Sequence, residues 1–307
     1  MIGGGRRPSR PIVLYVDQGF DHSPIATALE DELDARLGRA AEPNEAPEVV
    51  AIVTGVVPIG IDHAVRYPAL RSVVTCSIGT DHIDVDGLAA RGIAVRNTPT
   101  YCTDEVADHA LACVLAGLRG LAPLDAAVRA GNWDYAAAGL LRRVDSACLG
   151  IVGHGRIGRS LAGKADALGM SVLAYDPYVE EASDAELVSL DELLGRADAV
   201  SLHMPGTPGM APVLGAPELD RLRPHSILVN LSRPALVDLD AMLARLADGR
   251  LAGAFWDVWP EEPADPADPR LATPGLIVSP HAAWYSAEAE AANYDEAVAA
   301  LRETVLS

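Results

Sequence analysis

The chain has 307 residues, half of them apolar, and a formal net charge of −19 at pH 7. This length suffices for two domains of ordinary size. The negative charge argues against a surface for nucleic acid or anionic membranes, and no apolar segment approaches the ~20 residues that span a bilayer. The apolar run near the amino terminus is too short for a secretory signal, so we expect a cytoplasmic protein.

Apolar runs of strand length alternate with helical patterns from the start of the chain. The first four predicted strands are 11–17, 48–55, 71–77 and 92–98. A long helix is then predicted over 103–121, because Asp104 and Glu105 stand in its first turn, where the helix dipole favours negative charge.

The second half of the chain repeats this alternation and ends in a helix predicted over about 286–304. Its predicted strands are 147–153, 171–176, 198–204, 226–232, 253–259 and 275–280. Strands that are almost entirely Val, Ile and Leu, with helices between them, predict doubly wound parallel sheets of the α/β class. We therefore expect two such domains with a cleft between them: a discontinuous domain over 1–100 and 284–307, and a second over 101–283.

A glycine-rich motif follows the strand predicted at 147–153. Gly153, Gly155 and Gly158 form G-x-G-x-x-G before a helix, and Asp176 ends the next strand 18 residues beyond Gly158. Gly153 permits a tight turn, Gly155 lets the backbone approach a pyrophosphate, and Gly158 lets helix and strand pack closely. The pattern predicts a bound dinucleotide, the alternative being a glycine-rich turn without a ligand. The other motif residues expected beside the cofactor are His154, Arg156 and Ile157.

Asp176 also indicates which dinucleotide is bound. Its carboxylate would accept hydrogen bonds from the adenosine ribose hydroxyls and would repel a 2′-phosphate. The residues that follow, "PYVEE", contain no arginine to receive that phosphate. Asp176 therefore favours NAD over NADP.

Polar residues stand where the other strands of this domain end: His203, Ser232, Arg233, Asp257 and His281. Each alone is better explained as a solvated loop residue. In an open parallel sheet, however, ligands bind at the carboxyl ends of the strands, so the convergence of these residues predicts a site. We expect His203, Ser232 and Asp257 near the cofactor.

A bound nicotinamide requires a substrate anchor and a proton donor from the protein. Arg233 can bind a carboxylate through two parallel hydrogen bonds. His281 is suited to protonating the oxygen of a carbonyl that is being reduced. Glu262, in the loop after the next-to-last strand, is predicted to reach His281 and to favour its imidazolium form.

Three segments, "ILVNLSRPALVD", "FWDVWPEEP" and "IVSPHAAWYS", resemble the catalytic segments of the D-isomer-specific 2-hydroxyacid dehydrogenases. The resemblance extends over about residues 71 to 296. It implies a Rossmann NAD-binding domain, a smaller flavodoxin-like substrate domain, and NAD-dependent interconversion of a 2-oxo acid and a D-2-hydroxy acid. It also implies that Arg233, Glu262 and His281 are catalytic, that Asp257 contacts the nicotinamide carboxamide, and that Thr103 lies beside the cofactor.

The segment "TCSIGTDHIDVDGLAARGIAVRNTP" resembles the substrate-carboxylate loop of that family. The resemblance implies that backbone N–H groups of Ser77, Ile78 and Gly79 hold the carboxylate. Two departures matter. Pro234 stands where the family has glycine, which is expected to alter the backbone around Arg233. Trp284 replaces a small residue, and is expected either to form a wall of the substrate pocket or to pack between the domains.

The resemblance leaves the subgroup open. "PHAAWYS" is close to the C-terminal binding protein branch of NAD(H)-sensing corepressors, whereas "SIGTDHIDVD" resembles 3-phosphoglycerate dehydrogenases. A regulatory binding protein and a dehydrogenase of a phosphorylated or phosphonate hydroxy acid therefore stay as alternatives. The family also implies a homodimer, formed through about 103–145, with Trp133 and Tyr135 in the interface.

Other reactive side chains are predicted to be structural. The cysteines lack the spacing of a disulfide framework or a metal site; they are Cys76, Cys102, Cys113 and Cys148. The acidic run "DHIDVD" is interpreted as the start of a helix, and no metal is predicted. His109 and His225 are interpreted as residues without partners.

Overall fold

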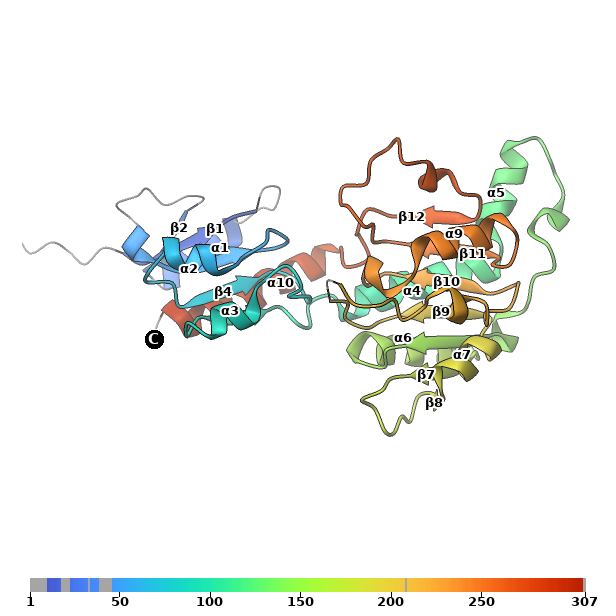
Figure 1. Ribbon diagram of the computed structural model, residues 1–307, viewed down its shortest axis with the longest axis horizontal. Coiled ribbons are helices and arrows are strands. Elements are labelled where there is room, and N and C mark those ends of the chain that lie inside the picture. The colour runs from blue at the N-terminus through green and yellow to red at the C-terminus, as the bar shows by residue number, and fades with distance from the viewer. Residues whose placement is uncertain (1–9, 18–22, 33, 39–45, 208, 306–307) are drawn as a thin grey trace, which may run out of the picture. The chain divides into compact units, whose positions relative to one another are not determined.

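The computed structural model describes residues 10–17, 23–32, 34–38, 46–207 and 209–305. The chain divides into two compact units, Met1–Tyr101 with Ser286–Ser307, and Cys102–Tyr285 (Figure 1). The predicted boundaries, after residues 100 and 283, lie one and two residues before these. Trp284 and Tyr285 belong to the second unit because the turn that precedes them is hydrogen-bonded there, through the N–H of Ala283.

The first unit contains a five-stranded sheet with the order β2-β1-β3-β4-β5, in which every pair is parallel. Its strands are β1 (Ile12–Tyr15), β2 (Arg36–Gly38), β3 (Val49–Thr54), β4 (Ser72–Thr75) and β5 (Ala94–Asn97). This is the flavodoxin-like order, and it confirms the predicted fold class. The sequence pattern misses β2, because the three residues "RLG" form no apolar run.

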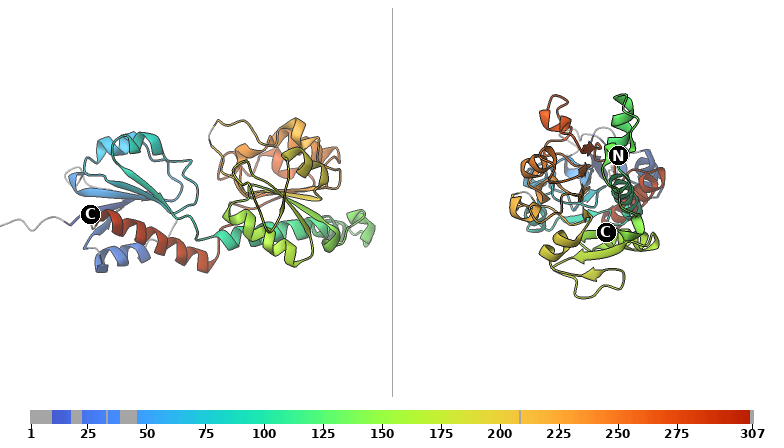
Figure 2. Two further views of the ribbon diagram at one scale, coloured as in Figure 1. Left: turned by 90° about the horizontal axis from the view of Figure 1, so that it is seen from below. Right: turned by 90° about the vertical axis from the view of Figure 1, so that its right-hand side faces the viewer.

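Helices cover both faces of this sheet (Figure 2). One face carries α1 (Ser23–Glu32) and α10 (Ala287–Val305), and the other carries α2 (Ile61–Arg66) and α3 (Val85–Ala89). The predicted final helix is thus confirmed as α10, whose Leu301 is fully buried in a cluster with Val13 and Ile25.

The second unit contains a seven-stranded parallel sheet with the order β12-β11-β10-β9-β6-β7-β8. Its strands are β6 (Cys148–Val152), β7 (Ser171–Tyr175), β8 (Glu186–Leu187), β9 (Ala199–Leu202), β10 (Ile227–Asn230), β11 (Gly253–Trp256) and β12 (Leu276–Val278). The order reverses between β6 and β9, as in the Rossmann fold, where ligands bind at that reversal. The pattern predicts six of these strands and misses the two-residue β8.

Helices also pack on both faces of the second sheet (Figure 2). One face carries α4 (Thr103–Leu118) and α6 (Arg156–Ala167), and the other carries α7 (Leu190–Arg196), α8 (Ala216–Leu219) and α9 (Leu239–Ala247). Short 3-10 helices complete the fold: η1 (Ala46–Glu48), η2 (Tyr135–Ala138), η3 (Val144–Ser146), η4 (Pro234–Leu236) and η5 (Pro269–Ala272).

The helix predicted over 103–121 ends earlier than expected. Gly120 adopts a left-handed conformation (φ 58°), and α5 (Leu121–Arg129) begins after it. A side chain at position 120 would place its Cβ 2.7 Å from the Cβ of Ala138.

Among the described residues no single helix is long and apolar enough to cross a membrane. The helices α4 and α5 meet that criterion only together, and they are bent by 57°.

The helix that carries the glycine motif, α6, is fastened to α4 by polar contacts. Lys164 Nζ lies 2.5 Å from Asp108 Oδ1 and 3.2 Å from Asp104 Oδ1. The hydroxyl of Ser160 donates to Asp104 at 2.8 Å. These contacts fix the orientation of α6, and therefore of the motif at its amino terminus.

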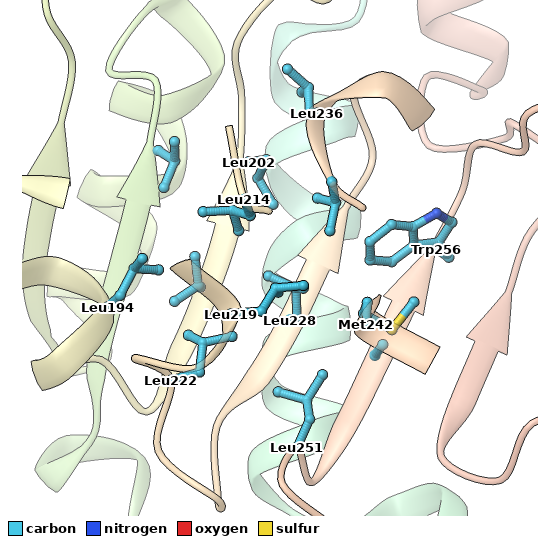
Figure 3. Close-up of a cluster of buried hydrophobic side chains, with 14 of the residues drawn as sticks. Leu194, Leu202, Leu214, Leu219, Leu222, Leu228, Leu236, Met242, Leu251 and Trp256 are labelled. Atoms are coloured by element: carbon cyan, nitrogen blue, oxygen red, sulfur yellow. The ribbon is translucent and has the colours of Figure 1, made fainter. Parts of the chain in front are cut away.

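A large apolar cluster packs between the seven-stranded sheet and the face covered by α7, α8 and α9 (Figure 3). It joins Leu202 of β9, Leu228 of β10 and Trp256 of β11 to Leu194 of α7 and Met242 of α9. Burial of each such side chain stabilises the fold by about 1.5–3 kcal/mol. Because Trp256 directly precedes Asp257 and is 1% exposed, the end of β11 has a rigid base.

The interpretation of His225 as a residue without a partner is wrong. Its Nε2 lies 2.7 Å from Oδ1 of the buried Asp198, which also accepts from Arg142 at 2.5 Å. The other oxygen of Asp198 accepts from the N–H of Cys148 at 2.9 Å, at the start of β6. The pair was not predictable from spacing, because 27 residues separate the two side chains.

Candidate functional site

The three motif glycines meet three different surroundings. Gly153 has a φ of 99°, and a Cβ on it would lie 2.4 Å from the carbonyl oxygen of His203. A Cβ on Gly158 would lie 2.2 Å from the carbonyl oxygen of Gly153, whereas a Cβ on Gly155 would meet nothing within 4 Å. Gly153 and Gly158 are therefore required by packing, and Gly155 leaves open space at the amino terminus of α6. This space suits a diphosphate.

Asp176 lies at the end of β7, beside the glycine turn, and is half-buried. Its Oδ2 accepts from the N–H of His154 at 2.8 Å, and its Oδ1 accepts from the N–H of Tyr178 at 2.9 Å. Each oxygen keeps a free lone pair, so the carboxylate can still accept from ribose hydroxyls.

The predicted cofactor residues at the neighbouring strand ends are held by local bonds. Burial lowers the pKa of His203 to about 4, so its ring is neutral near pH 7, with Nε2 2.8 Å from the hydroxyl of Ser201. Ser232 donates from its hydroxyl to the carbonyl of Leu202 at 2.7 Å. Thr103 is half-buried at the first position of α4. Arg156 and Ile157 form the first turn of α6.

The predicted contact between Glu262 and His281 is present, since Glu262 Oε2 lies 2.8 Å from His281 Nδ1. The other oxygen of Glu262 accepts from the N–H of Trp259 at 2.8 Å. Burial alone would raise the pKa of Glu262. The hydrogen bonds from His281 and Trp259, together with the positive charges of His281 and Arg233, outweigh burial and lower the pKa. Glu262 is therefore an ionised partner for the imidazole.

The loop that carries Glu262 is anchored by Trp259, which is 5% exposed. Its indole N–H donates to Asp268 at 3.2 Å, and the guanidinium of Arg270 lies 5.4 Å from its ring centroid. Hydrogen bonds from Arg270 lower the pKa of Asp268 to about 2. These contacts hold both ends of the loop that carries Glu262 in place. The sequence pattern did not predict this arrangement.

His281 has an unusual backbone that Asp257 stabilises. With a φ of 54°, His281 lies in the left-handed region, which is costly for a residue other than glycine. Its N–H donates to the carbonyl oxygen of Asp257 at 2.8 Å. The Asp257 carboxylate is 1% exposed and accepts from Ser279 Oγ (2.5 Å), Ala282 N–H (2.9 Å) and Ala283 N–H (2.8 Å). Asp257 thus holds the turn that presents the imidazole, a role that sequence reasoning missed.

Arg233 follows β10 in an extended conformation (φ −140°, ψ 144°). This is the region that a following proline imposes, and Pro234 begins η4, where a missing N–H has no cost. Pro234 therefore restricts the backbone of Arg233 without distorting it. Gly206 gives the arginine stem room, because a Cβ there would lie 2.7 Å from the Cβ of Arg233. The Nη1 atom of Arg233 donates to the carbonyl of Ser232 at 2.8 Å.

The predicted carboxylate loop follows β4 in the first unit. The hydroxyl of Ser77 donates to the carbonyl of Gly79 at 2.7 Å, and Asn97 donates to the carbonyl of Ile78 at 2.8 Å. Both bonds use carbonyl groups of the loop and none of its backbone N–H groups. Trp284 belongs to the second unit and is half-buried against Tyr285 in an edge-to-face contact of 5.4 Å.

The remaining reactive residues take the predicted structural positions. Cys76, Cys102 and Cys113 are buried and Cys148 is half-buried. Burial raises the pKa of the Cys76 and Cys113 thiols to about 12. Asp84 of the "DHIDVD" run caps α3 by accepting from the N–H of Gly87 at 3.0 Å. Within the described ranges no three His, Cys, Asp or Glu side chains cluster as a metal site would require.

Comparison with known proteins agrees with this geometry. Residues 111–283 match the model of the D-isomer specific 2-hydroxyacid dehydrogenase NAD binding domain. The chain is 35% identical to a glycerate dehydrogenase of Methylorubrum extorquens over 244 residues, which cover 76% of this chain and 75% of that protein. The fold is similar to that of Aquifex aeolicus D-lactate dehydrogenase complexed with NAD and lactic acid, with a TM-score of 0.84 and 26% identity over 96% of this chain and 95% of that chain. The chain belongs to the D-isomer specific 2-hydroxyacid dehydrogenase family.

Other relatives are longer than this chain. A D-3-phosphoglycerate dehydrogenase of Mycobacterium leprae is 35% identical over 289 residues, which cover 91% of this chain but 54% of that protein. The chain therefore spans about half the length of this relative. The family match establishes NAD as the cofactor, and the residues present fit it: open space at Gly155, and the acceptor Asp176 beside it.

Replacing Gly155 with Asp should abolish dinucleotide binding without unfolding the protein. Aspartate is a good helix N-cap, and its Cβ would enter open space, but its charge would repel the diphosphate. We expect the Kd for NADH, measured by fluorescence titration, to rise by at least about 100-fold. Gly163→Asp, which adds the same charge to an open position on the same helix, should leave the Kd unchanged. Equal loss in both variants would contradict this account of Gly155.

Replacing Asp257 with Asn should destabilise the turn around His281. The amide nitrogen cannot accept a bond, so one of the two backbone N–H groups of Ala282 and Ala283 loses its acceptor. We expect a loss of about 1–3 kcal/mol in the free energy of unfolding, measured by urea titration. Asp265→Asn, in the exposed loop nearby, is the control and should change it by less than about 0.5 kcal/mol.

Proposed function

We propose that the protein is an NAD-dependent oxidoreductase that interconverts a 2-oxo acid and a D-2-hydroxy acid. The observation that carries this proposal is the 2.8 Å contact between His281 and the ionised Glu262, within the positive field of Arg233. A proton donor, its carboxylate partner and a carboxylate-binding cation are the groups that such a reaction needs from the protein.

In the proposed mechanism, Arg233 binds the substrate carboxylate and polarises the adjacent carbonyl group. NAD, when bound in its reduced form, supplies the hydride. His281 gives a proton from Nε2 to the carbonyl oxygen, and Glu262 holds Nδ1 and stabilises the imidazolium before the transfer. In the reverse direction His281 takes the proton from the hydroxyl group. The backbone N–H groups of Ser77, Ile78 and Gly79 add hydrogen bonds to the carboxylate.

The relatives support two classes of substrate. A glycerate dehydrogenase and a glyoxylate reductase indicate a small hydroxy acid, whereas the D-3-phosphoglycerate dehydrogenases indicate a phosphorylated one. We propose a small unphosphorylated 2-oxo acid first, because the glycerate dehydrogenase matches over three quarters of both chains. The phosphorylated acid is the second candidate, supported by the 289-residue match.

The first test is turnover of NADH with a panel of 2-oxo acids: glyoxylate, pyruvate, hydroxypyruvate, and aromatic, thioether, phosphorylated and phosphonate acids. We expect the loss of NADH absorbance with at least one acid, and a decrease of at least about 100-fold in kcat for His281→Ala. His109→Ala, on α4, is the matched control. Tight NADH binding without any turnover would contradict the proposal and would favour the NAD(H)-sensing regulator.

The pH profile of reduction should depend on Glu262. His281 must carry a proton for this step, so the rate of reduction falls at high pH, where the imidazole is neutral. Because the pKa of Glu262 is lowered, its carboxylate stays charged across that range and stabilises the imidazolium. In Glu262→Gln the imidazolium loses this stabilisation, so the descending limb of kcat/KM should move to lower pH. Glu261→Gln, the exposed neighbour, should keep the original profile; an unmoved limb in Glu262→Gln would refute the assigned role.

We further propose that the protein forms a homodimer through α5 and the segment that follows it. Trp133, Tyr135 and Leu140 on this segment are 89%, 90% and 99% exposed, and exposed apolar groups of this size typify interfaces. In the double variant Trp133→Ser, Tyr135→Ser the dissociation constant of the dimer should rise by at least about 100-fold, measured by sedimentation equilibrium. Tyr178→Ser, 92% exposed on another loop, is the control. A monomeric unmodified chain would disprove the proposal.

A further inference from the structure

His154 occupies the second position of the glycine motif, and its side chain faces the protein interior. The residue is 0% exposed, and its Nε2 lies 2.9 Å from Asp184 Oδ1. Its backbone N–H donates to Asp176 Oδ2 at 2.8 Å. The ring is therefore closed to a bound cofactor, and one residue connects two carboxylates on the loop that follows β7.

The protonation of the ring follows from its partner. An ionised carboxylate only accepts hydrogen bonds, so Nε2 of His154 carries the proton in this contact. The other ring nitrogen, Nδ1, is buried and has no hydrogen-bond partner in the described part of the chain. Burying this nitrogen opposes folding, and an apolar side chain would avoid that cost. The bond to Asp184 is thus the specific contribution of the imidazole.

Asp184 lies on a loop, 176–185, which is anchored at both ends. Asp176 accepts from Tyr178 at the start, and Glu186 of β8 pairs with Leu173 of β7 at the end. The bond from His154 ties the last part of the loop to the glycine turn. Between these anchors the loop contains Glu180 and Glu181 and no lysine or arginine.

We propose that His154 is a positioning residue that makes the site selective for NAD(H) over NADP(H). By holding Asp184 against the glycine turn, it keeps an acidic loop beside Asp176, the expected acceptor for the ribose hydroxyls. A 2′-phosphate in that place meets the carboxylate of Asp176 and an acidic loop without lysine or arginine, whereas a hydroxyl group finds acceptors. The inference rests on dinucleotide binding by this domain and not on the identity of the hydroxy acid.

The test compares the Kd values of NADH and NADPH, measured by fluorescence titration of the full chain. In Asp184→Asn the ratio of the Kd for NADPH to the Kd for NADH should fall by at least about fivefold, mainly because NADPH binds more tightly. In His154→Leu this ratio should fall by a similar factor, because the loop loses the hydrogen bond from His154 to Asp184. His154→Gln, which keeps a donor, should stay within about twofold of the original preference. Asp166→Asn, which removes one charge at the other end of α6, about 15 Å along the helix, should change nothing.

The ratio of the two Kd values separates this role from simple packing. Loss of packing alone would weaken NADH and NADPH equally and leave the ratio unchanged. If the ratio stays within about twofold of the original in both Asp184→Asn and His154→Leu, the proposal is overturned. Should His154→Leu fail to fold, Asp184→Asn decides the matter, because Asp184 is partly exposed. If no acid of the panel is turned over but the ratio of the Kd values still falls in these variants, the proposed reaction is refuted and the role of His154 is not.

Discussion

All strands of the seven-stranded sheet run in one direction, so their carboxyl ends meet along a single edge. The order reverses between β6 and β9, where the glycine turn packs against the backbone of His203 without room for a Cβ. The residues that follow the strands on either side of this reversal supply the acceptor Asp176, the cation Arg233 and the imidazole of His281. The chemistry of the site is thus a consequence of strand direction combined with a few side chains at the strand ends.

Buried carboxylates hold several loops of this acidic chain. Asp257 and Asp17 are each buried and accept backbone N–H groups from segments distant in sequence. Such backbone donors satisfy the oxygens of a buried carboxylate without a lysine or arginine partner. The net charge of −19 therefore coexists with well-defined loops.

Sequence patterns predicted the features that depend on local spacing. Each motif glycine has the surroundings expected from its position, and the contact of Glu262 with His281 follows from two strand ends that lie side by side. The strands β2 and β8 were missed because two or three residues carry no pattern. The bonds of Asp257 and the burial of His154 were also missed, because they depend on side-chain rotamers and on partners more than 20 residues away.

The contacts of Lys164 between α4 and α6 have a consequence for the chemical reactivity of the protein. Lys164 is the one lysine in the sequence. Partial burial opposes its charge, but hydrogen bonds and charges from Asp108 and Asp104 outweigh this and raise its pKa. An ammonium group is not a nucleophile, and this one is also held between two aspartates. The side chains of this chain therefore offer almost nothing to acylating or aldehyde reagents, which makes it a poor substrate for amine labelling and for lysine-directed crosslinking.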